Sequence, residues 1–368
     1  MSDGADRPRA GDAEHRFDAA DERFGHLTQE PFATPGLVHR AALADPAWRE
    51  SLFFVMHRPD APGDVLILTL AHFPGRGEMD SLQLGRVDGA QSFARHVRPC
   101  TTDPDDWRVG PVHIDVLEPR RCVRLRVEES SASPVALDVT FTARTEPYQL
   151  RRGRMRAGDD VVWDQRHMIQ GGWYEGTYAR GGETRRIERW WGQRDHSWGI
   201  RAHARCPMWM WLAVQLPEGM VGVWCWELAD GTRVYTDGCL APASGAAPIP
   251  VATFAHDVEW LGADGHPVSY GQCGEAVHGL AGTVTIRLED GRRIDLEARG
   301  RWAQRYDLWM PPPSDPAALA SRLGGGLSEM MVRTRDGQSG TAIFEVTGQR
   351  HVRYFPVARG ERLGDRAG

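Results

Sequence analysis

The chain has 368 residues, enough for one large domain or two of ordinary size. Hydrophobic residues make up 41% and charged residues 26%, which is typical of a globular protein and excludes a disordered one. The net charge of −6 gives no basic surface, so we expect no nucleic acid partner. No apolar run approaches the roughly 20 residues of a membrane span, so we also expect no transmembrane segment.

The first 23 residues are polar and charged, and they lack the apolar stretch of a secretory signal. We therefore expect residues 1–23 to form a disordered tail and the protein to be cytoplasmic. Cysteine usage agrees with a reducing compartment, because no pair has the short spacing that binds zinc, and we expect no metal site. The six cysteines are Cys100, Cys122, Cys206, Cys225, Cys239 and Cys273.

Taken in chain order, the predicted elements are mostly short strands. A helix is possible over Val38–Glu50, and strands are predicted at Val65–Ala71 and, by two-residue alternation, at Val135–Thr142. Thr283–Ala298 is typical of a hairpin on an Asp-Gly turn, and Ser314–Leu323 has the start and stop residues of a helix. So many strands and turns predict an all-β fold.

The chain contains no sharp linker. The segment between Arg201 and Pro207 is our preferred boundary, which gives an N-terminal domain over 24–200 and a C-terminal domain over 201–360.

Met208–Leu228 is predicted to be a hairpin. A three-residue loop over 217–219 would pair Leu216 with Met220 and would place Trp209, Trp211 and Gln215 on the same face as Glu227. In a barrel, this mixed face could line a ligand cavity. The alternative is that Glu227 and Gln215 lie at the solvent and the indoles merely cover the sheet.

The run from Trp190 to Trp211 combines an acid, a base, arginines and five indoles. Flat aromatic rings next to titratable groups indicate a lined cavity for an apolar ligand. If the segment is extended, Asp195 and His196 point to opposite faces and cannot form a dyad with each other. Asp195 then serves either catalysis or a buried salt-bridge network between the two halves, and the residues alone leave both open.

The stretch Gly192–Arg201 (GQRDHSWGIR), followed by a Trp-x-Trp strand, resembles the hydroxyneurosporene synthase (carotenoid 1,2-hydratase) and AttH-like superfamily, and more distantly tocopherol cyclase. The resemblance is closest to bacterial proteins with the Arg-Asp-His-Ser-Trp-Gly motif. It implies two lipocalin-like antiparallel β-barrel domains packed together around an apolar cavity. It also implies protonation of an isoprenoid-type alkene, then water addition or ring closure, without a redox cofactor. Five residues match: Asp195, His196 and Trp198 in the motif, and Trp209 and Trp211 in the strand.

The function predicted is therefore a cofactor-independent lyase or isomerase that acts by acid catalysis on a terpenoid, steroid or related lipid. Asp195 and Glu227 are the expected proton donors, and His196 would hold or relay the proton. The remaining candidates bind substrate or water, and they are Trp198, Trp209, Trp211, Gln215, Tyr174 and Tyr270. Two alternatives stay open: a binding protein for a small apolar ligand, and tryptophans that are plain core. The oligomeric state is left open.

Overall fold

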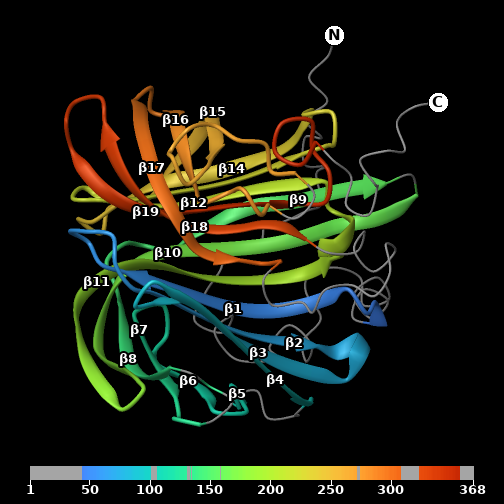
Figure 1. Ribbon diagram of the computed structural model, residues 1–368. Coiled ribbons are helices and arrows are strands. Elements are labelled where there is room, and N and C mark those ends of the chain that lie inside the picture. The colour runs from blue at the N-terminus through green and yellow to red at the C-terminus, as the bar shows by residue number, and fades with distance from the viewer. Residues whose placement is uncertain are drawn as a thin grey trace.

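The computed structural model describes residues 44–100, 106–130, 133, 135–157, 159–271, 274–307 and 323–356. Within these ranges the protein is built from antiparallel β-strands and two short 3₁₀ turns, η2 (Pro74–Arg76) and η3 (His203–Arg205). The strands form one large curled sheet followed by one closed barrel (Figure 1). The predicted all-β fold of two lipocalin-like barrels is confirmed.

The first sheet contains the strands from β1 to β11. Its spatial order is β4-β3-β2-β1-β11-β10-β8-β7-β6-β5, with β9 paired to the first half of β10. The sheet curls because its two end strands, β4 and β5, approach each other through hydrogen bonds such as the one from Arg98 Nε to the Arg108 carbonyl. The strands are β1 (Trp48–His57), β2 (Val65–Phe73), β3 (Glu78–Val87), β4 (Ala90–Pro99), β5 (Arg108–Val109), β6 (Val112–Glu118), β7 (Cys122–Val127), β8 (Ala136–Ala143), β9 (Tyr148–Ala157), β10 (Asp160–Arg180) and β11 (Glu183–Arg201).

The second unit is a closed barrel in which β12 pairs with both β13 and β19. Its strands follow one another in simple up-and-down order, and closure leaves no free edge. They are β12 (Met208–Leu216), β13 (Gly219–Glu227), β14 (Arg233–Pro242), β15 (Ile249–Leu261), β16 (Gly279–Leu288), β17 (Arg293–Arg305), β18 (Gly324–Thr334) and β19 (Ser339–Gly348).

Three apolar clusters hold this architecture together. One fills the curl of the first sheet, and one fills the barrel. The third joins residues of the first sheet, such as Val55 and Trp163, to residues on the outside of the barrel, such as Trp209 and Trp226. We call this third region the junction. Figure 1 shows the barrel stacked over β1, β10 and β11, which form the floor of the junction.

Most predicted strands are confirmed. Val65–Ala71 lies in β2, Val135–Thr142 matches β8 closely, and the Asp-Gly hairpin over 283–298 joins β16 to β17. The predicted helix over 38–50 is wrong at its end, because Trp48–Glu50 begins β1. Residues 1–43, with the expected tail, and most of 314–323 lie outside the described residues. No helix of the described chain is long and apolar enough to span a membrane.

The predicted register of the β12–β13 hairpin is wrong by one residue. Leu216 pairs with Gly219, so the loop has two residues and Trp211 pairs with Trp224. A one-residue shift moves every side chain of β13 to the other face. Glu227 therefore shares the barrel interior with Met208, whereas Trp209 and Trp211 lie in the junction.

Candidate active site at the junction

Asp195 and His196 of strand β11 point to opposite sides of the first sheet. The strand is extended, and Asp195 pairs with Phe53 while His196 pairs with Leu52. Phe53 packs against the junction cluster, and Leu52 belongs to the interior of the first sheet. The expectation that Asp195 and His196 cannot act as a dyad with each other is therefore confirmed, since alternate side chains of a strand face opposite sides.

His196 forms a buried pair inside the first sheet. Its Nε2 lies 3.1 Å from Oε1 of Glu50, and both side chains are excluded from solvent. The Trp198 ring packs at 5.5 Å from the imidazole, centroid to centroid. Tyr174 lies in the same interior and donates its hydroxyl hydrogen to the Gln193 carbonyl. Three predicted site residues thus belong to this compartment and not to the junction.

Asp195 faces the junction beside a histidine from the neighbouring strand. Oδ2 of Asp195 lies 3.2 Å from Nε2 of His167 on β10, and both side chains are buried. The His167 ring also packs edge-on against Trp224 of the barrel, with 4.4 Å between centroids. Burial lowers the pKa of His167, so its imidazole is neutral around pH 7 and can accept a proton.

A second carboxyl group enters the junction from the barrel. Glu345 on β19 accepts a hydrogen bond of 2.8 Å from the Tyr306 hydroxyl, and a further one from the indole of Trp209. Burial raises the pKa of Glu345 to about 7, and the negative charge of Asp195 raises it further against the effect of these hydrogen bonds. Such a carboxyl group is poised to give or take a proton near neutral pH.

Two arginines of the first sheet complete the polar side of the junction. Arg201 at the end of β11 donates from Nη2 to the Ser51 hydroxyl at 2.7 Å. Burial lowers the pKa of Arg201, and the charge of Arg49 lowers it further. Asp195 and Glu345 act on Arg201 in the opposite direction. We call this group the junction site, and its members are Arg49, His167, Asp195, Arg201, Trp209, Tyr306 and Glu345.

Aromatic rings form the apolar side of the same region. Trp211 packs edge-on against Phe53 at 5.5 Å between centroids. Phe53 keeps part of its surface accessible, as does Tyr306. Gln215 is fully buried here, and neither its amide oxygen nor its nitrogen has a hydrogen-bond partner among the described residues. Unsatisfied buried groups of this kind call for a bound water or ligand.

Glu227 lies inside the barrel and takes part in a hydrogen-bonded network. Arg233 contacts its Oε1 at 2.7 Å, His256 contacts the same oxygen at 3.2 Å, and His351 contacts Oε2 at 3.0 Å. Burial alone would raise the pKa of Glu227, but the hydrogen bonds from these three residues outweigh it and hold the pKa well below its ordinary value. An ionised carboxylate cannot act as a proton donor. Tyr270 is also in the barrel core, where its hydroxyl accepts the Gly325 amide.

The same network fits a metal ion poorly, although Cys225, Glu227 and His256 bring their ligand atoms within 4.8 Å of one another. The guanidinium of Arg233 already lies against Oε1 of Glu227 and would repel a cation. Nδ1 of His351 accepts the amide hydrogens of Arg353 and Tyr354, so Nε2 carries the ring hydrogen and cannot ligate.

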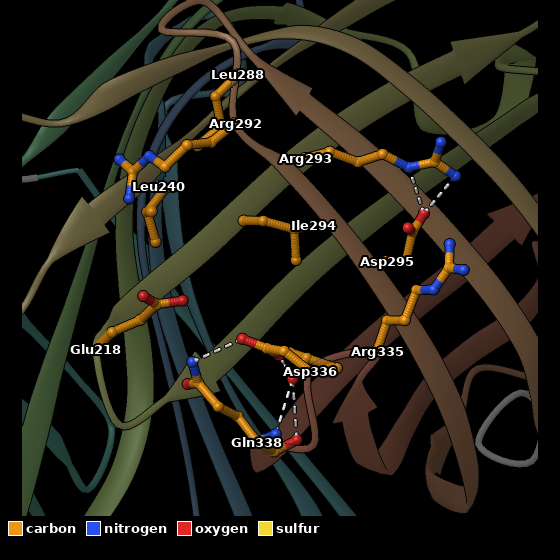
Figure 2. Close-up of a pocket in the computed structure, with 11 residues that line it drawn as sticks. Glu218, Leu240, Leu288, Arg292, Arg293, Ile294, Asp295, Arg335, Asp336 and Gln338 are labelled. Carbon is orange, nitrogen blue, oxygen red and sulfur yellow. Dashed lines mark hydrogen bonds and ion pairs between the residues drawn. The ribbon is translucent and has the colours of Figure 1, made fainter.

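A separate pocket of about 490 Å³ opens among the turns at one end of the barrel (Figure 2). Figure 2 shows charged side chains arranged around Ile294. Several of these charges are neutralised by ion pairs within the same turns, because Arg293 pairs with Asp295 and Arg292 pairs with Asp290. The pocket is lined by Glu218, Leu240, Leu288, Arg292, Arg293, Ile294, Asp295, Thr334, Arg335, Asp336 and Gln338.

Sequence reasoning brought Asp195, Trp209, Trp211 and Gln215 to one region but missed their partners. One partner is Glu345, whose side chain turns into the junction because β19 closes the barrel against β12. His167 lies next to Ser197 across β10 and β11, a pairing that only the long β10–β11 hairpin creates. The alternation of both strands could have suggested that His167 and Asp195 share a face.

Comparison with known proteins gives a family for this chain. A family of unknown function (DUF8625) matches residues 28–300. The chain belongs to this family. The matched region includes Asp195, His167, Arg201 and Trp209 but ends before Glu345. No curated protein sequence matches the chain.

Two solved structures are similar to this chain in fold or outline. An AttH-type protein from Nitrosomonas europaea has 14% identity and a TM-score of 0.54, over 82% of this chain and 93% of that one. Kievitone hydratase from Nectria haematococca has 12% identity and a TM-score of 0.49, over 82% and 89%. The first likeness shows a shared fold, and the second adds no further conclusion about this chain.

Proposed function

We propose that this protein is a cofactor-independent acid–base enzyme of the lyase or isomerase class, and that it acts on a small apolar molecule bound at the junction site. The observation that carries the proposal is the Glu345 carboxyl group, with a pKa of about 7, in the same compartment as Asp195 and His167. Neighbouring titratable groups whose environments push their pKa values apart are typical of acid–base pairs.

In this proposal Glu345 gives or takes the proton on one side of the substrate. His167 is the partner base on the other side, and Asp195 orients its imidazole and stabilises the charge that it gains. Hydrogen bonds from Tyr306 and Trp209 hold the Glu345 carboxyl group in place. His196 and Glu227, which the sequence suggested as catalytic, lie in other compartments and have no role in this chemistry.

The substrate would be a terpenoid, a steroid or a related lipid in which a proton adds to one carbon of a double bond, and water or a second double bond then attacks the other carbon, as in a hydratase or a cyclase. Three features support this. The Arg194–Gly199 motif resembles the carotenoid hydratase and AttH-like superfamily, the fold is shared with an AttH-type protein, and Trp211 and Phe53 offer flat apolar surfaces. No cofactor is needed for such proton transfer.

A lipocalin-like binding protein is the second candidate function. It is favoured by the unsatisfied amide of Gln215 and by the indole N–H of Trp211, which has no partner among the described residues. Such groups could hold a polar atom of a ligand without any chemistry.

In the deciding experiment, the small molecules that co-purify with the protein are extracted and identified by mass spectrometry. These molecules, together with a panel of terpenoid and steroid ketones, are then incubated with ligand-free protein in D₂O. We expect the wild type to add or remove water, or to exchange hydrogen for deuterium in a bound compound. Glu345→Gln and Asp195→Asn should each lower this rate by roughly 10²–10⁴-fold while the protein stays folded.

Glu218→Gln is the matched control, because Glu218 is an exposed carboxylate at the mouth of the barrel. A compound that binds the wild type but is never converted would contradict the enzyme and favour the binding protein.

A further inference from the structure

The junction site contains two arginines that contact no carboxylate of the described residues, although the guanidinium of Arg49 packs over the Phe73 ring at 5.5 Å from its centroid. Arg201 is only 7% exposed, and the hydrogen bond that its guanidinium forms to a described residue goes to the neutral hydroxyl of Ser51. Nε of each arginine is buried and has no hydrogen-bond acceptor in the part of the chain that the structure describes. Buried cations are normally paired, so this arrangement lacks an anion.

The carboxylates within electrostatic reach offset part of these positive charges, but they hydrogen-bond or pair with other groups and do not contact either guanidinium. Asp80 is the strongest negative influence on Arg49, but its Oδ2 accepts a hydrogen bond from Arg95 at 3.0 Å. Asp195 lies against His167, and Glu345 is bound by the Tyr306 hydroxyl.

The two arginines lie on the same face of neighbouring strands, because Arg49 pairs with Gly199 across β1 and β11 and Arg201 lies two residues beyond Gly199. The charge of Arg49 is the main electrostatic factor that lowers the pKa of Arg201, in agreement with this placement on one face. Two nearby guanidinium groups offer several N–H donors in fixed planar geometry, which suits the oxygens of a carboxylate or an enolate. An apolar surface with Phe53 and Trp211 lies in the same junction.

We infer that the substrate of the junction site carries an oxyanion, a carboxylate or an enolate, on an otherwise apolar skeleton, and that Arg49 and Arg201 bind this oxygen. This inference rests on the proposed function, since it names the substrate class of the same site. It also changes the expected chemistry. Two adjacent cations repel a carbocation, whereas they stabilise the negative oxygen that forms when a carbon next to a carbonyl group loses a proton.

The test uses a matched pair of probes, 2-naphthoate and 2-naphthamide, which share one flat apolar skeleton and differ in charge. Isothermal titration calorimetry of each probe with the wild-type protein gives two dissociation constants. We expect 2-naphthoate to bind at least tenfold more tightly than 2-naphthamide. Arg49→Gln and Arg201→Gln should each reduce this ratio to below about threefold.

Arg293→Gln at the mouth of the barrel is the matched control and should leave the ratio unchanged. Arg49 is half-buried, and its Nε has no hydrogen-bond partner among the described residues, so its variant tests the inference even if Arg201→Gln does not fold. Equal binding of the two probes would overturn the oxyanion inference but leave an apolar site intact. Failure of both probes to bind would overturn the proposed function as well.

If the ratio of the two dissociation constants falls only in Arg293→Gln, the anion binds at the mouth of the barrel, and this result would overturn the inference.

Discussion

At the scale of single residues, Glu345 couples the stability of the protein to pH. Its pKa is about 7 in the folded protein and 4.5 in an unfolded chain. Between these values the folded state holds a proton that the unfolded state releases, so stability falls as pH rises from 4.5 to 7 and is constant above that range. The difference between these two pKa values corresponds to a change in the free energy of unfolding on the order of 3 kcal/mol.

Comparison with Glu345→Gln isolates this effect, because the amide cannot ionise. We expect the free energy of unfolding of the wild type, measured relative to the variant by urea denaturation, to decrease by this amount between pH 4.5 and pH 8. A constant difference across this range would show that Glu345 has an ordinary pKa. His57 titrates in the opposite sense, since burial lowers its pKa to about 4, but it is common to both proteins and cancels.

At the scale of elements, the Glu227 network fastens the segment after β19 to the barrel. Glu227 belongs to β13, Arg233 to β14 and His256 to β15, while His351 and Tyr354 follow β19. Removal of one partner from a buried ion pair leaves the others uncompensated, which costs about 3–5 kcal/mol. Glu227→Gln should therefore lower the free energy of unfolding by this amount without changing the affinity for 2-naphthoate.

Thermal unfolding and titration calorimetry together check this prediction. A Glu227→Gln protein that keeps its stability but loses ligand binding would return Glu227 to the functional site, as the sequence alone suggested. Asp230→Asn serves as a control, since Asp230 is an exposed turn residue three positions along the chain.

The β12–β13 hairpin shows how far the sequence can predict the elements. Alternation predicted both strands, and it correctly grouped Trp209, Trp211 and Gln215 on one face. The turn Pro217-Glu218-Gly219 is compatible with two loop lengths, and the choice between them decides where Glu227 points. The place of Glu345 in the junction could not be predicted, because it depends on β19 pairing with β12, more than a hundred residues earlier, and no local pattern encodes such a closure.

At the scale of the whole molecule, the junction makes the first sheet and the barrel one folding unit. Both sides give large side chains to one buried cluster, and the buried Arg86–Glu329 pair joins β3 to β18. Neither unit could keep these surfaces buried alone. We expect a single cooperative transition, in which the calorimetric enthalpy equals the van't Hoff enthalpy and tryptophan fluorescence and far-ultraviolet circular dichroism change together.

Glu329→Met is the variant that probes this coupling, because it leaves Arg86 buried without a counter-charge. Two separate transitions in the wild type would mean that the units fold independently and that the junction contributes little to stability. A single transition that splits only in the variant would show that the Arg86–Glu329 pair is needed for cooperativity.

The opposite orientations of Asp195 and His196 have a consequence for how such a protein can change by insertion or deletion. Strand β11 borders both the interior of the first sheet and the junction. Whether a residue has an odd or an even place along the strand alone decides which of the two its side chain enters. A single inserted or deleted residue upstream in the strand would send the histidine into the junction and the aspartate towards Glu50, exchanging the contents of both compartments at once. Length changes in this strand are therefore tolerable only in steps of two, or where a bulge absorbs the extra residue.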